Sequence, residues 1–501
     1  MKKVFIVVLV VLFLWGFFLR SVEVINGNYL FGHDHGRDYL AAYEIVENHK
    51  LTLIGAEAGS GVAGFNGIFQ GPGYFYLIAL AYALFGGDPM GGQFFMLLFG
   101  LAAMVLAAYV GYEIFGSVGS VVFLFFVTVS PLIVSQSRFI WSSHPVTLFV
   151  ILALYFAFRI PEKSKIFAPL AIFTAGFAYH SQLGVAVPLV VTLFLSLPLI
   201  YRIFDWKVYV YSFVAVLLAF SPMIAFDMRH GFMATKSIVG TGSSGLGGSV
   251  FDPIRLSSHA FDYWNNFYNT FTFEFGWIPR NIQMFILWAT LPFLGVGLWI
   301  AKQKRFVLFL LLLLVTTWAG YLFLNNTVWD YYLTHARIAY MLLYVISLLA
   351  LVRIYKRSYI AKAGLVVFGI FLAIFVVGSA FRQYVSYTVD IADMHVYEKI
   401  QGKKLVIDTI YADASDQSFS VFVFMPSVYT HPYDYLFKTY AKKIYGYEPT
   451  QKKQGRAYLI IEPDFSQIWR HKGWLETVVN GGETIWKKTL LNGLILEKRV
   501  Y

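Results

Sequence analysis

The chain has 501 residues, of which 58% are hydrophobic and only 13% are charged, about half the charge of a typical soluble protein. A mean hydropathy of +0.63 and several uncharged runs of 19 residues or more exclude disordered, collagen-like and nucleic-acid-binding classes and indicate an integral membrane protein. Cysteine is absent, which excludes disulfide scaffolds, cysteine zinc sites and thiol nucleophiles.

The N-terminus carries Lys2 and Lys3 before an apolar segment with no small-residue cleavage site after it, which predicts a retained signal anchor. Ten further apolar runs bring the predicted number of transmembrane helices to eleven. The predicted spans are approximately 4–19, 91–112, 117–136, 142–158, 166–179, 183–201, 208–226, 283–301, 306–324, 338–352 and 363–381.

One more apolar run, from Tyr74 to Gly86, has only 13 residues, or about 20 Å of helix against a hydrocarbon core of about 30 Å. We therefore predict an interfacial or re-entrant helix there. With eleven spans and a cytoplasmic N-terminus, the inner segments comprise 34 residues that hold 14 of the 23 Lys and Arg residues before residue 382. Because cytoplasmic loops are enriched in Lys and Arg, this orientation predicts an extracytoplasmic tail and accounts for most of the net charge of +11.

Charge density changes abruptly near Phe381. Residues 382–501 contain 29 charged side chains in 120 positions, whereas residues 1–381 contain only 38. We therefore predict a transmembrane catalytic domain over 1–381 and a small soluble α/β domain over 382–501. Within that tail, strand-like runs lie at 405–410, 419–425 and 458–461, and a helical stretch lies near 433–445.

Two predicted outer loops, about 20–90 and 227–282, are far longer than the 12–15 residues beyond which loops usually carry function. In the first, residues 38–48 place Tyr39 and Tyr43 on one helical face, which predicts a helix on the membrane surface. The second contains the Gly- and Ser-rich stretch 240–248, which is typical of a flexible segment.

The first outer loop also holds the densest group of ionisable residues, at positions 33–38. Two carboxylates, two imidazoles and a guanidinium are costly to hold near lipid unless they have a function. A carboxylate there could deprotonate an acceptor hydroxyl, or Asp34 and His35 could hold a divalent metal. The alternative is a solvated loop in which Asp34 caps the following helix.

Three other polar groups lie at predicted outer turns. Residues 137–144 combine Arg138 with Trp141 and His144, which suits either phosphate binding or an interfacial position. Arg229 and His230, at the outer end of the seventh span, suit an anionic ligand or a charged helix end. His180 lies in a turn after a short span, so that it lines a cavity or is satisfied within a buried turn.

Several motifs, in their order along the predicted spans, resemble the GT-C superfamily of polytopic glycosyltransferases, in particular the protein mannosyltransferase and aminoarabinose transferase branch. The segments that carry the resemblance are Asp34–Leu40, Leu51–Gly55, Gly71–Tyr76, Ser137–Trp141 and Phe226–Phe232. They cover the membrane domain, and the tail fits the variable outer domain of that superfamily.

The resemblance implies a donor sugar carried on polyprenyl phosphate and a catalytic base at the position of Asp34. An anionic leaving group needs fixed cations at the transition state. The candidates for binding the donor phosphate are Arg37, Arg138, Arg229 and His230. The candidate acceptor or cavity contacts are Asp38, Gln70, Tyr74, Trp141, His144 and His180.

The sequence departs from the superfamily pattern at two positions. Many relatives have His where this chain has Gln70, and Trp-Asn-Pro where it has Trp141-Ser142-Ser143. These departures leave the acceptor, and any divalent metal, open.

The function predicted from the sequence is sugar transfer, hexosyl or pentosyl, to a lipid, glycan or protein hydroxyl at the outer face of the cell membrane, as in the synthesis of a cell envelope glycan. The main alternative is a polytopic transporter or flippase of lipid-linked sugars. That class predicts charged or broken helices at mid-membrane and repeat symmetry, whereas the predicted spans carry no Asp, Glu, Lys or Arg and show no repeat. An oligosaccharide ligase and a receptor that binds through its tail are further alternatives.

Overall fold

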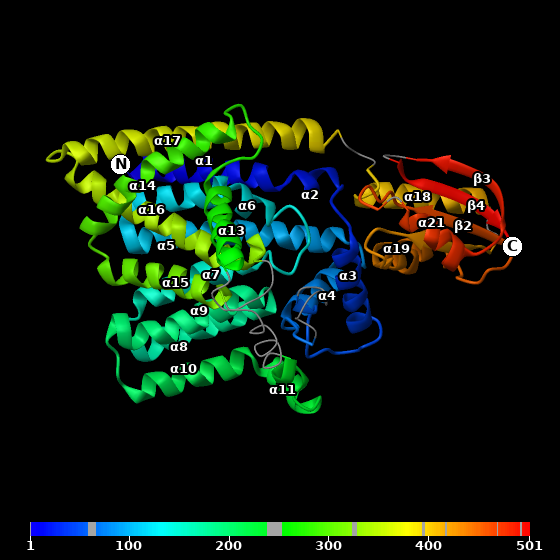
Figure 1. Cartoon of the computed structure of the whole chain (residues 1–501), viewed down its shortest axis with the longest axis horizontal. Coiled ribbons are helices and arrows are strands. Elements are labelled where there is room, and N and C mark those ends of the chain that lie inside the picture. Colours follow the sequence, from blue (N-terminus) through cyan, green and yellow to red (C-terminus); the bar gives the residue numbers. More distant parts are fainter. Residues whose placement is uncertain are drawn as a thin grey trace.

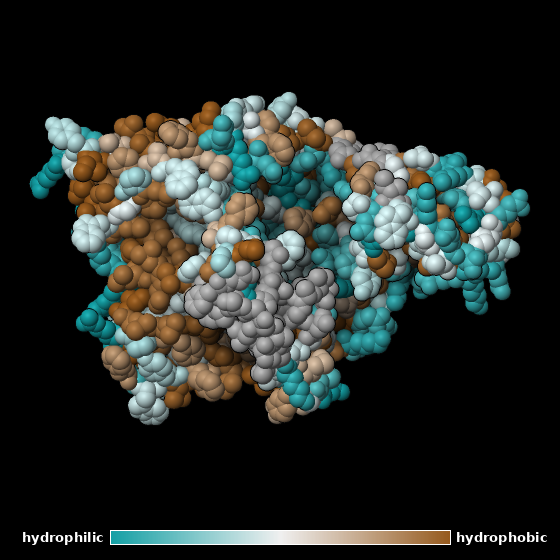
Figure 2. All heavy atoms as spheres, in the orientation of Figure 1, coloured by the Kyte–Doolittle hydropathy of each residue, from teal (hydrophilic) through white to brown (hydrophobic). Residues whose placement is uncertain are grey.

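The computed structural model describes residues 2–58, 67–237, 253–322, 328–392, 396–415, 418–467, 469–490 and 493–501. The predicted flexible stretch 240–248 lies outside these residues. Figure 1 shows a helical bundle with a small domain at one end, and the chain terminates in that domain. On the face shown in Figure 2, hydrophobic residues cover much of the bundle away from the small domain, whereas the small domain is mostly hydrophilic.

Apolar helices build the bundle because their backbone polar groups are satisfied internally, as a lipid environment requires. They are α1 (Lys2–Arg20), α5 (Met90–Val129), α7 (Val146–Arg159), α8 (Ser164–Phe177), α9 (Leu183–Ser196), α10 (Trp206–Ala219), α14 (Arg280–Ile300), α15 (Lys304–Leu322), α16 (Thr334–Ile354) and α17 (Tyr359–Val385).

Helix α5 contains two predicted spans, which meet at Gly116. This glycine has φ 77° and ψ −169°, a backbone conformation that an L side chain would strain. Counting both halves of α5, a helix is present at each of the eleven predicted spans. Within the described part of the chain, seven helices are long and apolar enough to cross a membrane, or eight if α10 and the helix bent from it by 64° form one span. Eleven spans therefore stay a prediction.

Shorter elements connect the bundle helices, mostly at the end that carries the small domain (Figure 1). The α-helices among them are α2 (Val22–Asn26), α3 (His33–Val46), α4 (Gly73–Leu84), α6 (Pro131–Ser135), α11 (Ser221–Arg229) and α13 (Pro253–Phe271). The other helical turns are η2 (Ala178–His180), η3 (Leu197–Tyr201), η4 (Asp330–Leu333) and η5 (Ser386–Asp390). The last of these continues α17 beyond Phe381 towards the small domain.

The C-terminal domain has a four-stranded sheet of order β1-β2-β4-β3, in which β1 and β2 are parallel and the other pairs antiparallel. The strands are β1 (Ser420–Phe424), β2 (Arg456–Ile461), β3 (Glu483–Thr489) and β4 (Ile495–Val500). The helices are α18 (Ile400–Ala414), α19 (His431–Leu436), η6 (Phe437–Ala441), α20 (Lys442–Tyr445), α21 (Arg470–Trp474) and η7 (Leu475–Val479). The predicted α/β tail is therefore present, and so is the predicted helical stretch near 433–445.

The strand predicted at 405–410 is wrong, because these residues lie within α18. A short apolar run does not by itself distinguish a strand from a buried helix. The pattern over a longer segment identifies a helix, because the following buried positions recur every three or four residues and form one helix face. They are Lys403, Val406, Ile407, Ile410, Tyr411 and Ala414.

The tail packs directly on the first outer loop, with which it shares a hydrophobic core. The ring of Tyr435 in α19 lies 6.0 Å from that of Phe31 and 5.2 Å from that of Tyr39, measured between centroids. The Tyr435 hydroxyl donates a hydrogen bond to the carbonyl oxygen of Gly87 at 2.5 Å. Tyr39 is fully buried, so α3 is covered by the tail on this side and does not lie free on the membrane surface.

Gly36 of α3 lies directly against the backbone at the start of α19. A Cβ atom at this position would lie 2.3 Å from the Pro432 nitrogen and 2.4 Å from the His431 carbonyl carbon. Since these are backbone atoms, Gly36→Ala is expected to push α19 away and to lower the free energy of unfolding by about 1–3 kcal/mol. Thermal unfolding and protease accessibility of the tail measure the effect.

Gly473→Ala provides the matched control, because Gly473 is also helical and lies in the tail, and a Cβ atom there would meet no other atom within 4 Å. Equal unfolding temperatures for the two variants would contradict close packing of α3 on α19.

Candidate functional site

The ionisable cluster at 33–38 forms the first turns of α3 and is helical, where the sequence left open a solvated loop. The helix begins after Gly32, whose backbone N–H donates to the His35 Nδ1 at 2.7 Å. Asp34 lies in the first turn, where the helix dipole favours a negative charge. Residues three and four apart share a helix face, and so Asp34, Arg37 and Asp38 face the same side.

Arg37 joins the two carboxylates of the cluster. Its Nη1 lies 2.8 Å from the Asp34 Oδ1, and its Nη2 and Nε donate to the Asp38 Oδ1 at 2.7 and 2.9 Å. The Asp34 side chain is 34% exposed, whereas that of Asp38 is fully buried. Burial raises the pKa of Asp38 to about 6, although the Arg37 guanidinium acts in the opposite direction. The two carboxylates therefore differ in solvent access.

Polar atoms without partners gather around the buried side of the cluster. The Asp38 Oδ2, the Tyr74 hydroxyl and the His35 Nε2 are buried and have no hydrogen-bond partner among the described residues. The charge of Asp38 acts on Tyr74, which places the start of α4 beside α3. Buried polar groups are nearly always satisfied, so these atoms are available to a ligand or to water.

The turn 137–144 packs against α3 through its aromatic side chains. The His35 ring lies 6.2 Å from that of Phe139, which lies 4.3 Å from His144. Trp141 in turn lies 4.4 Å from Tyr331 in η4. Burial lowers the pKa of His35 to about 4, so this imidazole is neutral at physiological pH. The structure thus brings Trp141 and His144 close to the cluster.

The tail completes the rim of the cluster. His33 stacks on His431 with ring centroids 4.9 Å apart and on Tyr429 at 5.1 Å. Tyr429 is 59% exposed. These three rings lie beside Asp34, the next residue after His33, so the C-terminal domain supplies part of the surface that a substrate would meet at this carboxylate.

Gln70 and His180 lie together at a neighbouring corner. The Gln70 Nε2 donates to the Gln182 Oε1 at 3.2 Å, and the Gly73 backbone N–H donates to the His180 Nδ1 at 3.0 Å. Since Tyr74 follows Gly73 directly, the first turn of α4 connects this corner to the acid cluster.

Arg138 is not free in this structure. Its Nη2 lies 2.5 Å from the Glu23 Oε1 and 2.5 Å from the Asp390 Oδ2, and its Nη1 donates to the Ser386 hydroxyl at 2.7 Å. These contacts tie α2, the 137–144 turn and η5 together. To bind a donor phosphate, Arg138 would have to exchange at least one carboxylate partner.

Arg229 and His230 lie at the end of α11 and are exposed. The His230 Nδ1 is 2.8 Å from the Phe226 carbonyl oxygen, and neither residue forms an ion pair within the described part of the chain. The structure does not bring them into contact with the α3 cluster. It does join their helix to the first outer loop, since Phe226 lies 5.5 Å from Phe69 between ring centroids.

A further cation near the site was missed from the sequence. Arg337, near the start of α16, is almost fully buried, and its Nη2 lies 2.7 Å from the Asp330 Oδ2. Asp330 also accepts a hydrogen bond from the Asn266 Nδ2 at 2.7 Å. The available signal was an Asp and an Arg seven residues apart just before the tenth predicted span, next to Tyr331.

No group of three or more His, Asp and Glu side chains able to hold a metal ion occurs among the residues that the structure describes. Asp34 and His35, the metal ligands suggested from the sequence, therefore have no third ligand within that part of the chain.

Comparison with known proteins gives matches of two kinds. Residues 70–226 match the sequence model of the dolichyl-phosphate-mannose-protein mannosyltransferase family. No curated protein matches the chain in sequence. Among solved structures, ArnT from Cupriavidus metallidurans bound to undecaprenyl phosphate matches with a TM-score of 0.55 and 14% identity, over 100% of this chain and 98% of that chain.

The apo form of the same ArnT matches with a TM-score of 0.53 and 13% identity, again over 100% of this chain and 98% of that one. A weaker similarity, with a TM-score of 0.43 and 14% identity, joins 93% of this chain to 69% of an oligosaccharyltransferase from Archaeoglobus fulgidus. The first two structural matches show that the chain has an ArnT-like fold, and the family match over residues 70–226 agrees with the resemblance found in the motifs.

Proposed function

We propose that this integral membrane protein is a glycosyltransferase that moves a sugar from a polyprenyl-phosphate donor to an acceptor hydroxyl at the outer face of the membrane. The observation that carries the proposal is the partly exposed Asp34 carboxylate, held by Arg37 beside the buried Asp38. The ArnT-like fold and the mannosyltransferase family match support the same reaction class.

In the proposed reaction, the acceptor oxygen forms a bond to the anomeric carbon while the bond from that carbon to the donor phosphate oxygen breaks. The acceptor proton passes to Asp34, and polyprenyl phosphate leaves as an anion. Asp34 suits the base because a general base must reach its proton within hydrogen-bond distance, and of the two clustered carboxylates it alone is open to solvent.

Arg37 is the proposed first cation for the leaving phosphate, because its guanidinium directly contacts Asp34. Arg229 and His230, at the end of α11, are proposed to contact the phosphate only when donor is bound. Arg138, in the 137–144 turn, is proposed as a further contact of the phosphate. Fixed positive charge next to a developing anion is the usual source of rate enhancement in such a step.

The acceptor contacts are proposed to come from Asp38, Tyr74, Trp141 and His144 around the base, with Gln70 and His180 lining the neighbouring corner. The N-terminus is proposed to be cytoplasmic and the tail over 382–501 extracytoplasmic, so that the site opens to the outer face.

The test is incubation of the purified protein with a radiolabelled polyprenyl-phosphate sugar. A glycosyltransferase transfers the label to added acceptor, or to water at a slow rate, and releases polyprenyl phosphate. A transporter of lipid-linked sugars would leave the donor intact while moving it across a vesicle membrane, and that result would refute the proposal.

Asp38 gives a pH-dependent prediction. Its folded pKa of about 6 lies above the ordinary value of 3.8, so the folded state holds this proton more tightly than the unfolded state does. Protonated Asp38 therefore contributes about 3 kcal/mol to the free energy of unfolding. This contribution is fully present below pH 3.8 and is lost as the pH rises through about 6. Relative to Asp38→Asn, the wild type should therefore gain stability when the pH is lowered from 7 to 4. Unfolding temperatures of both proteins across this range measure the difference, and parallel curves would contradict it.

A further inference from the structure

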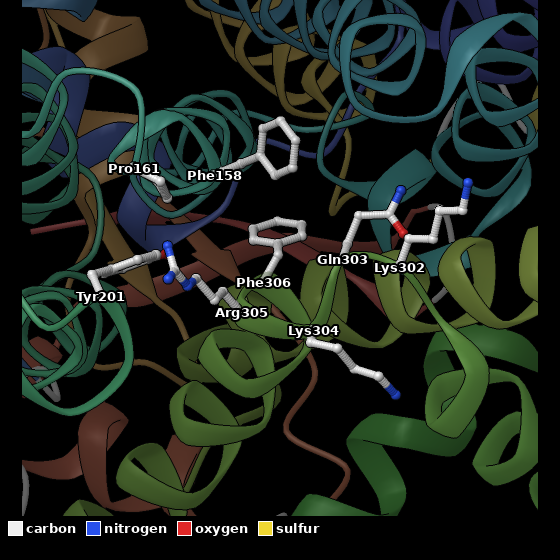
Figure 3. Close-up of a pocket in the computed structure, with 8 residues that line it drawn as sticks. All are labelled: Phe158, Pro161, Tyr201, Lys302, Gln303, Lys304, Arg305 and Phe306. Atoms are coloured by element: carbon white, nitrogen blue, oxygen red, sulfur yellow. The ribbon is translucent and has the colours of Figure 1, made fainter.

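A cavity of about 340 Å³ lies at the end of the bundle opposite α3. It is bounded by the turns that join α7 to α8 and α14 to α15, and by the end of the helical segment after α9. Figure 3 shows its apolar wall, formed by Phe158, Pro161 and Phe306. The Phe158 and Phe306 rings pack edge to face with centroids 5.4 Å apart.

Positively charged side chains lie on both sides of this apolar wall. In Figure 3, Lys302 lies on one side of the cavity and Arg305 on the other, next to Tyr201. Lys304 extends away from the other lining residues, and its ammonium donates to the carbonyl oxygens of Leu298 and Trp299 at the end of α14. Lys302 and Arg305 are therefore the two lining cations for which the described part of the structure shows no such hydrogen bond.

Among the described side chains, Lys302 and Arg305 lack carboxylate partners of the kind that Arg159 and Lys165 have at the same end of the bundle. Arg159 pairs with Glu113 and Glu162, and Lys165 pairs with Asp205. Within the described ranges, neither Lys302 nor Arg305 takes part in a salt bridge. Two unpaired cations beside a concave apolar wall raise the local concentration of anions, because low-dielectric walls focus the field.

The depth of the cavity in the membrane is indicated by its aromatic neighbours. Trp299 is 81% exposed, and Phe204 and Trp206 are also exposed on the adjoining turn. In membrane proteins such residues, Trp above all, gather at the level of the lipid headgroups. The volume equals that of roughly ten water molecules, which exceeds the need of a single phosphate.

We propose that this cavity binds the phosphate group of an anionic lipid headgroup, with Lys302 and Arg305 on the phosphate and the wall of Phe158, Pro161 and Phe306 against the glycerol and upper acyl chain. A free phosphate shares the anionic chemistry but would leave the apolar wall without a partner. The site is separate from the α3 cluster and does not depend on sugar transfer.

The experiment titrates short-chain phosphatidylglycerol into the full-length protein in neutral detergent and follows the unfolding temperature. Phosphatidylcholine and inorganic phosphate form the parallel arms. Phosphatidylglycerol is expected to raise the unfolding temperature of the wild type, with the other two having little effect. The double variant Lys302→Gln and Arg305→Gln should bind it about 30-fold more weakly, since each cation near a membrane surface contributes about a factor of five.

Lys356→Gln with Arg357→Gln is the matched control. These two cations are exposed on the turn between α16 and α17, at the same end of the bundle and outside the cavity. Retained phosphatidylglycerol binding in this control, together with its loss in the cavity variant, would support the site. Equal losses of phosphatidylglycerol binding in the two double variants would mean that general surface charge attracts the lipid, and this result would overturn the proposal. An equal rise in unfolding temperature with inorganic phosphate would show that the site does not require a lipid, and this result would also overturn the proposal.

Sugar transfer provides an independent readout. The Lys302→Gln and Arg305→Gln variant is expected to keep its transfer rate in neutral detergent, because both residues lie at the opposite end of the bundle from Asp34. A negative lipid titration would therefore not contradict the proposed transferase activity. Likewise, absence of transferase activity would not contradict the proposed lipid site.

Discussion

Asp34→Asn is expected to lower the rate of sugar transfer by about 10²–10⁴-fold, the usual contribution of a general base. The substitution keeps the size of the side chain and one oxygen for Arg37, but it cannot accept the acceptor proton. Because Asp34 is partly exposed, the unfolding temperature should change little. Transfer from polyprenyl-phosphate sugar, measured under single-turnover conditions, separates this chemical step from donor binding.

Asp38→Asn is the control, since it removes the second carboxylate that Arg37 contacts. It should alter stability and its pH dependence more than the rate of transfer. If Asp38→Asn abolishes transfer while Asp34→Asn retains it, the base is Asp38. Normal transfer in both variants would remove the carboxylates from the mechanism.

Arg138→Ala is expected to lower the free energy of unfolding by about 2–4 kcal/mol, because it removes the guanidinium that pairs with both Glu23 and Asp390. The expected loss extends below the range of about 3–5 kcal/mol for fully buried ion pairs, because Asp390 is 30% exposed whereas Arg138 is only 6% exposed. Unfolding in detergent, compared with equilibrium binding of the donor, distinguishes a structural effect from a phosphate contact.

A triple variant tests whether the loss of stability comes from the carboxylates that Arg138 pairs with. Adding Glu23→Gln and Asp390→Asn to Arg138→Ala removes the uncompensated charges and should restore more than half of the lost stability. Arg229→Ala, at an exposed arginine with no ion pair among the described residues, should change stability by no more than about 0.5 kcal/mol. If Arg138→Ala is equally mild and only donor binding falls, the ion pairs are not what holds Arg138 in place.

The helices of the bundle could be predicted from the sequence because hydropathy alone determines which segments lipid can surround. The predicted pause between 112 and 117 corresponds to the break at Gly116 within α5. The re-entrant candidate at 74–86 corresponds to the short helix α4. The ionisable cluster at 33–38 could also be predicted, because its members are adjacent in the chain and contact one another.

Contacts between distant residues could not be predicted in the same way. Arg138 and Asp390 are 252 positions apart, and a single sequence contains no signal that pairs them. The same is true of His33 and His431, whose stacking puts the tail at the rim of the site. The position of Arg229 outside the α3 cluster depends on the 64° bend between α10 and α11, which hydropathy does not reveal.

The packing of α3 on α19 has a consequence for how the protein is made. The ribosome completes residues 33–38 long before it reaches residues 429–436, which lie nearly 400 positions later. At about 5–20 residues per second, roughly 20–80 s separate the two. During that interval Phe31 and Tyr39 lack the partner ring of Tyr435, so we expect the nascent chain to expose this apolar surface until the tail has been synthesised and has folded.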